Sequence, residues 1–283
     1  MRKLDLPTIA VKDTLAACLN GVSSVNLKQR VQAVGHTLQA AEDTYLALGK
    51  NGELYSIPIA EDVAGQVSGD EMKALYTQYF VPEKKPGRNL YNKLKSAPKH
   101  SICPLCGQRV VSTLDHYLAK AKHPALTITP ANLVPACADC NKIKLAAQAT
   151  RASEQTLHPY FDNVEGEQWL KAMVVETPPP AVQFFVETPN TWDAVLRQRV
   201  QTHFDDFELA SLYGTQAAVE LTNIAESLVN LKGTCGSDAV RQHLLLQAAS
   251  RRRAHLNSWQ TALYTALADS AWFCETGVDL ILL

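Results

Sequence analysis

The segment Cys103–Ala146, CPLCGQRVVSTLDHYLAKAKHPALTITPANLVPACADCNKIKLA, holds four of the seven cysteines of this 283-residue chain. They form two C-x-x-C pairs, Cys103 with Cys106 and Cys137 with Cys140. A C-x-x-C turn presents two thiolates at a separation that suits tetrahedral zinc, and two such turns complete one site. The segment therefore predicts a structural Zn²⁺ site. The alternative interpretation is a redox dithiol, for which the second matched pair is superfluous.

The composition is that of a globular protein, with 46% hydrophobic and 19% charged residues. A chain of this length can bury at least one good core and divide into two or three packed regions. Neither an apolar run of signal length near the start nor a run of 18 apolar residues elsewhere is found, so we expect a cytoplasmic protein without membrane insertion. In a reducing compartment the paired cysteines indicate a metal, and Cys18, Cys235 and Cys274 are expected to be small buried hydrophobes.

Helical periodicity dominates both ends of the chain. Apolar residues recur at helical spacing over residues 25–48 and 69–80, and a short basic amphipathic helix is expected within residues 82–100. Two β-rich runs around a triple proline in residues 167–188 predict a hairpin, and three or more helices follow. The predicted fold class is α+β and mostly helical. Its predicted parts are an N-terminal helical region (1–83), a basic segment with the cysteine core (84–165), and a short β hairpin with C-terminal helices (166–283).

Charge is distributed unevenly although the formal net charge is only −1. Between Lys84 and Arg151 there are 12 Lys and Arg residues against 2 acidic residues. Such a strip can neutralise phosphates without reading bases, although a charge run is often only a solvated surface. The candidate DNA-binding residues are Lys84, Lys85, Arg88, Lys93, Lys95, Lys99, Lys142 and Lys144. A second cluster, Arg251 to Arg253, is compatible with contact to DNA or to a protein partner.

The residues between the cysteine pairs indicate more than a structural metal site. A β-branched run ends in Asp115-His116, and Asn132 and Asn141 follow in that order. With these residues, Cys103–Leu145 resembles the HNH endonuclease family in its four-cysteine version. The resemblance implies a central ββα-metal core, in which a helix crosses a hairpin, with structural zinc and flanking helical regions.

The same resemblance implies roles for the four polar residues. His116 would be the general base toward water, and Asn132 would fix the loop and orient the histidine. Asp115 and Asn141 would hold a catalytic divalent ion, Mg²⁺ or Mn²⁺, since both offer hard oxygen donors. Asn141 replaces the histidine of the plainest HNH pattern. Alternatively, Asp115 and His116 tie the hairpin by a hydrogen bond, and Asn141 bonds local backbone.

His158 lies outside the core motif, in LHPYFDN. A similar His-Pro-Tyr-Phe-Asp segment follows the zinc helix in some related nucleases, and a capped turn is the alternative interpretation.

The function implied by the resemblance is a metal-dependent HNH endonuclease that nicks or cleaves DNA with little sequence specificity. The segment from Gly87 to Lys144 also resembles HNH effectors of bacterial anti-phage defence systems of the Zorya or Septu type. Its partners would then be DNA and other proteins of a defence operon. Two alternatives stay open: a non-catalytic, zinc-stapled DNA-binding protein, and an RNA-cleaving toxin with the same core. The sequence does not indicate the oligomeric state.

Overall fold

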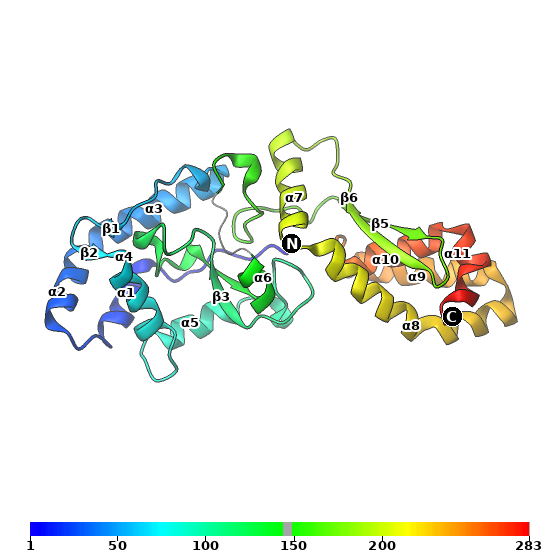
Figure 1. Ribbon diagram of the computed structural model, residues 1–283, viewed down its shortest axis with the longest axis horizontal. Helices are drawn as coiled ribbons and strands as arrows, with labels where there is room; N and C mark the ends of the chain where they lie inside the picture. The colour runs from blue at the N-terminus through cyan, green and yellow to red at the C-terminus, as the bar shows by residue number, and fades with distance from the viewer. Residues whose placement is uncertain (144–148, 283) are drawn as a thin grey trace. The chain divides into compact units, whose positions relative to one another are not determined.

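The structure is a computed structural model that describes residues 1–143 and 149–282. The chain divides into two compact units, Met1–Asn163 and Val164–Leu283 (Figure 1). Helices predominate, and the described strands form three two-stranded antiparallel sheets. The predicted α+β class with mostly helical content is confirmed at this level. The boundary expected after residue 83 lies inside the first unit.

The first unit contains six α-helices and four short strands among its described residues. The helices are α1 (Val11–Leu19), α2 (Val25–Ala33), α3 (Gly35–Asn51), α4 (Gly69–Leu75), α5 (Arg88–Lys95) and α6 (Ala138–Ile143). The strands are β1 (Asp62–Val63), β2 (Val67–Ser68), β3 (Thr113–His116) and β4 (Leu133–Ala136). Single turns of 3₁₀-helix cover Leu54–Ser56, Lys99–Ser101, Pro124–Leu126, Pro130–Asn132 and Ala152–Glu154, and Tyr76–Phe80 is a π-helical turn. The helix expected over residues 25–48 is two helices, because the backbone leaves helical geometry at Val34.

One hydrophobic core joins the front helices to the β3–β4 hairpin. Val31, Leu38 and Phe80 from the helical part are fully buried in the same cluster as Leu114 and Leu133 from the hairpin. Residues on both sides of position 83 therefore share one core. Since burial of each large apolar side chain contributes about 1.5 to 3 kcal/mol, this shared core holds the hairpin in place.

Buried hydrogen bonds from two residues of α1 fix the position of this helix in the unit. The carboxylate of Glu42 on α3 accepts hydrogen bonds from the Val11 amide at 2.9 and 3.0 Å, which satisfies the N-terminus of α1. The Thr14 hydroxyl on α1 donates to the Ile128 carbonyl at 2.7 Å. Helix α1 is thereby attached to the loop that connects β3 to β4.

Helix α4 begins with a capping box. The Ser68 hydroxyl accepts from the Glu71 amide, and the Glu71 carboxylate accepts from the Ser68 amide. The Arg30 guanidinium on α2 pairs with the same carboxylate at 2.5 Å. The hydrogen bond from Arg30 is the main cause that lowers the pKa of Glu71 from 4.5 to about 2.

We expect Glu71→Gln to destabilise the protein by up to about 1 kcal/mol at pH 7, because glutamine can still accept from the Ser68 amide but loses the charge that pairs with Arg30. A carboxyl group whose pKa is lowered by folding stabilises the folded state above its unfolded pKa. This contribution declines as the pH falls from 4.5 toward 2. Urea unfolding at pH 7, 4 and 3 should show the difference between variant and wild type shrinking. Glu83→Gln, at an exposed position, is the control; a difference that does not change with pH would contradict the assignment.

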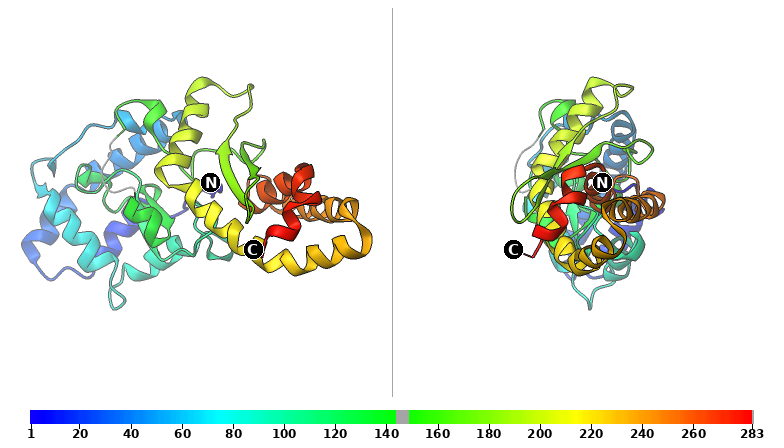
Figure 2. Two further views of the ribbon diagram at one scale, coloured as in Figure 1. Left: turned by 45° about the vertical axis from the view of Figure 1, so that its right-hand side comes forward. Right: turned by 90° about the vertical axis from the view of Figure 1, so that its right-hand side faces the viewer.

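The second unit is a hairpin packed on helices. The predicted hairpin is confirmed as β5 (Leu170–Val175) and β6 (Ala181–Val186), paired antiparallel. The helices are α7 (Ala194–Asp206), α8 (Leu209–Cys235), α9 (Ser237–Ala254), α10 (Trp259–Asp269) and α11 (Ala271–Glu275), with a last 3₁₀ turn at Gly277–Leu280. Strand β5 packs against α10 and β6 against α8 (Figure 2). Gly236 joins α8 to α9 with a φ of +85°, which only glycine adopts readily.

Of the helices in the described ranges 1–143 and 149–282, none combines the length and the apolar character needed to cross a membrane.

Candidate active site and metal centre

Four buried thiols converge at the base of the hairpin. The sulfur atoms of Cys103, Cys106, Cys137 and Cys140 all lie within 4.8 Å of one another. A glycine with φ of +65°, Gly107, closes the first turn, and its amide donates to the Cys103 carbonyl at 2.8 Å. Four sulfurs in this arrangement fit the tetrahedral site that structural zinc requires. The structure thus brings together all four residues predicted as metal ligands.

Local hydrogen bonds favour thiolates at two of the four cysteines. Backbone amides donate to the sulfurs of Cys106 and Cys137, each at 3.4 Å. Hydrogen bonds among the thiols, first of all with Cys103, lower the pKa of Cys106 and of Cys137. The same bonds raise the pKa of Cys103 and Cys140. A bound cation favours the thiolate form, so zinc would complete the deprotonation.

An ion pair ties the two cysteine turns together from outside. Arg109 Nε, three residues after Cys106, lies 2.8 Å from a carboxylate oxygen of Asp139 in the second turn. Both residues were counted in the charge pattern, but their pairing was not predicted. It depends on the two turns meeting in space, 30 residues apart in the sequence.

The hairpin β3–β4 sets the position of Asp115 and His116. Asp115 pairs with Val134 and His116 with Leu133 in antiparallel register. Asp115 is 7% exposed, and His116 is half-buried at the end of the strand. Helix α6 packs against β3 (Figure 1), so Asn141 lies on the element that contacts the strand carrying Asp115.

Asn132 is fully buried, and its side chain makes hydrogen bonds with the backbone of the loop after β3. Its Oδ1 accepts from the Leu118 amide at 2.7 Å, and its Nδ2 donates to the carbonyls of Leu118 and Leu126 at 3.0 and 3.1 Å. Its own carbonyl accepts from the Tyr117 amide at 2.8 Å. One amide side chain therefore holds both ends of the loop between β3 and β4.

This loop in turn orients the histidine. His116 Nε2 lies 2.8 Å from the carbonyl oxygen of Thr127, the neighbour of Leu126. A carbonyl only accepts hydrogen bonds, so Nε2 carries the hydrogen and Nδ1 is the basic nitrogen of the neutral ring. The Tyr76 ring packs edge-on against the imidazole, with centroids 4.6 Å apart. The sequence contains no local signal for Tyr76, because it comes from the π-helical turn 40 residues upstream.

A lysine also packs on that tyrosine. Lys120 Nζ lies 4.9 Å from the centroid of the Tyr76 ring. Burial lowers the pKa of Lys120; Asp115 acts in the opposite direction, and Lys73 lowers it further. Lys120 belongs to the basic strip, and no local sequence pattern indicates its place beside Tyr76.

Asn141 and Lys142 follow Cys140 on helix α6. The Asn141 amide donates to the Cys137 carbonyl at 3.1 Å, and its side chain is half-buried. Lys142 is exposed on α6. Lys144 lies outside the described residues.

His158 belongs to the core of the first unit. Its ring is 1% exposed and packs 4.2 Å from the Tyr117 ring, centroid to centroid. Nδ1 accepts from the Tyr160 amide at 3.1 Å, and Nε2 lies 3.0 Å from the Tyr45 hydroxyl. The His158 amide also donates to Asp162 at 2.6 Å, which closes the turn. These contacts give the imidazole a role in packing.

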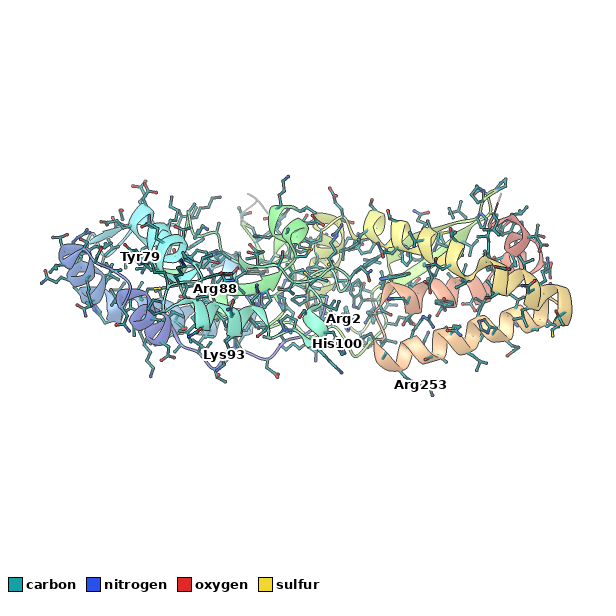
Figure 3. All side chains as sticks on the ribbon, turned by 90° about the horizontal axis from the view of Figure 1, so that it is seen from below. Arg2, Tyr79, Arg88, Lys93, His100 and Arg253 are labelled. Carbon is teal, nitrogen blue, oxygen red and sulfur yellow. The ribbon has the colours of Figure 1, made fainter. Side chains whose placement is uncertain are left out.

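The predicted DNA-binding residues on and around α5 divide into two groups. Lys84, Lys93 and Lys99 are exposed. The half-buried cations lie on aromatic rings: Lys85 on Tyr79 at 5.0 Å, and Arg88 and Lys95 on Tyr91 at 4.8 and 5.9 Å. Figure 3, seen from below, shows Arg88 and Lys93 on one side of the first unit, with Arg2 and His100 further along the same side.

The C-terminal arginines also differ from one another. Arg251 packs 4.1 Å from the Tyr264 ring centroid and 3.7 Å from a Glu220 carboxylate oxygen. Arg252 and Arg253 are exposed on the last turn of α9.

The chain is similar to protein Ea31 of Escherichia phage lambda. The two sequences are 28% identical over 293 residues, which covers 96% of this chain and 99% of that protein. The similarity therefore includes both compact units and not only the cysteine segment. No family model matches the chain, and no solved structure matches it.

Proposed function

We propose that this protein is a metal-dependent endonuclease with an HNH-type active site that hydrolyses DNA phosphodiester bonds. The main support is the chain of contacts from Asn132 through the loop to His116. The buried Asn132 fixes the loop through the Leu126 carbonyl. The next carbonyl of that loop, that of Thr127, accepts from His116 Nε2 and so assigns the hydrogen to that ring nitrogen. This arrangement leaves Nδ1 with the lone pair that a general base needs.

The residues present fit a hard divalent ion beside His116. Asp115 offers a buried carboxylate and Asn141 an amide oxygen on the adjoining helix, and Mg²⁺ and Mn²⁺ prefer such oxygen donors. Such an ion would stabilise the negative charge that builds up on the phosphate and on the departing oxygen. The four-cysteine cluster would hold zinc as a structural ion.

The chain's own residues account for the remaining steps. His116 Nδ1 takes a proton from the attacking water, and the Thr127 carbonyl stabilises the imidazolium that results. The exposed lysines Lys84, Lys93 and Lys99 contact backbone phosphates without reading bases. DNA binding of this kind has little sequence preference and weakens as salt rises.

We expect the purified protein to nick or linearise supercoiled plasmid in Mg²⁺ or Mn²⁺ and to be inactive in EDTA. Total RNA, digested in parallel, should remain intact. Preferential loss of the RNA would favour the ribonuclease alternative. Plasmid that is bound in a gel-shift assay but never cut, whatever the metal, would favour the non-catalytic DNA-binding protein.

We further propose that the nuclease acts as an effector of anti-phage defence with partner proteins encoded nearby, on the basis of the sequence resemblance described above. Cells that express the protein with its neighbouring genes should reduce phage plating, and the His116→Ala variant should not. Equal plating with both would contradict a defence role without bearing on nuclease activity.

A further inference from the structure

Lys120 stands at a rigid position close to the candidate catalytic residues. It follows His116 by four residues, and the preceding Leu118 is bound through both its amide and its carbonyl by Asn132. The next turn is closed by the amides of Lys122 and His123, which donate to the Ala119 carbonyl at 2.9 and 3.0 Å. The backbone that carries Lys120 is therefore fixed on both sides.

Tyr76 restrains the ammonium group as well as the imidazole. The tyrosine is 5% exposed and presents its ring to Lys120 Nζ at 4.9 Å, while it packs against His116 at a centroid distance of 4.6 Å. A cation this close to an aromatic ring is attracted by the ring's quadrupole. The same phenol ring thus contacts both the lysine's ammonium group and the candidate general base.

The charges around Lys120 favour an additional anion. Asp115 attracts the ammonium, but Lys73 on α4 repels it, and burial removes part of its hydration. The ion-pair partner of Lys73 is Asp70, at 2.6 Å, whose side chain is 90% exposed. Solvent screens that pair strongly, so it does little to offset the two ammonium groups. An anionic oxygen beside Lys120 would relieve their repulsion.

We propose that Lys120 contacts a non-bridging oxygen of the phosphate that is cleaved, and that Tyr76 positions this lysine. The inference rests on the proposed nuclease function and adds a substrate-contacting residue to it. A lysine ammonium suits this task because it acts as a compact point charge with three donors. The contact strengthens as negative charge develops on the phosphate, so it contributes mainly to the turnover rate.

The test is steady-state cleavage of a short DNA duplex by the full-length protein in Mg²⁺. Lys120→Met keeps the length of the side chain and removes its charge; we expect kcat to fall about 10²-fold with a much smaller change in KM. Lys120→Arg keeps the charge and should recover most of the activity. Lys122→Met, in the same turn, is the matched control and should cleave like wild type.

Two outcomes would overturn the proposal while leaving the nuclease assignment intact. In the first, Lys120→Met cleaves like wild type and His116→Ala is inactive, so the lysine only packs on Tyr76. In the second, Lys120→Met and Lys120→Arg lose activity and thermal stability equally, so the role is structural. Failure of the wild-type protein to cleave DNA in either metal would instead overturn the proposed function itself.

The positioning role of Tyr76 is tested by coupling. Tyr76→Leu removes the ring from both neighbours, and Tyr76→Phe keeps the ring, so only the first should lower kcat. If Tyr76 acts through Lys120, adding Lys120→Met to Tyr76→Leu should cost much less than the 10²-fold expected in the wild-type background. Fully additive effects in a variant with normal thermal stability would show that Tyr76 does not act through the lysine.

Discussion

Replacement of Cys137 by serine is expected to remove the bound metal and to unfold the first compact unit. The four cysteines are at most 3% exposed, so loss of one ligand leaves three thiols buried around a site that no longer closes. Structural zinc contributes about 10 to 16 kcal/mol of apparent binding free energy in small zinc-finger peptides. That is comparable with the whole stability of a typical domain, about 5 to 15 kcal/mol.

The measurement is zinc content by elemental analysis together with thermal unfolding of the full-length chain. Wild type should carry one zinc per chain, and Cys137→Ser should carry none and lose a cooperative transition. Cys235→Ser is the control, because Cys235 is exposed at the end of α8 and the expectation that it is buried was wrong. If Cys137→Ser melts like wild type, the cluster does not hold a structural metal.

The second large effect is expected from His116→Ala. Removal of a general base typically slows a reaction by 10² to 10⁴, so plasmid cleavage should fall by about that factor. The side chain is half-buried and its partner Thr127 is buried, so thermal unfolding is measured beside cleavage; we expect most of the protein to stay folded and the loss of cleavage to be much larger than any loss of stability. DNA affinity, measured in EDTA by fluorescence anisotropy, should remain close to that of wild type.

Variants of two further histidines are the controls for His116→Ala. His36→Ala, at an exposed position on α3, should cleave like wild type. His158→Ala should instead lower the melting temperature, because it removes a ring that packs among Tyr45, Tyr117 and Phe161. Normal cleavage by His116→Ala would contradict the assignment of the general base.

Local patterns were sufficient for several elements of the fold. The β5–β6 hairpin follows from two β-rich runs on either side of three prolines, and the end of β3 at Asp115-His116 follows a β-branched run. Helix periodicity also located α4, α5 and the C-terminal helices. It failed at Val34, because the spacing of apolar residues continues across the break between α2 and α3 and only the backbone geometry reveals it.

Such local patterns did not predict the contacts between residues that are distant in the sequence. Arg109 pairs with Asp139, 30 residues away in the sequence. Tyr76 packs on His116 and Lys120, which follow it by 40 and 44 residues. The placement of His158 in an aromatic cluster is of the same kind. Each depends on which faces the core brings together.

The sequence by itself identified the four cysteines of the cluster as two C-x-x-C turns, since that spacing sets the sulfur positions within each turn before any long-range folding. It also determined the mostly helical α+β character, because hydrophobic periodicity is a local property. Only the tertiary structure decided which nitrogen of His116 is basic and which cation lies near it. Those properties depend on the Thr127 carbonyl and the Tyr76 ring, which reach the histidine only after the core has closed around the hairpin.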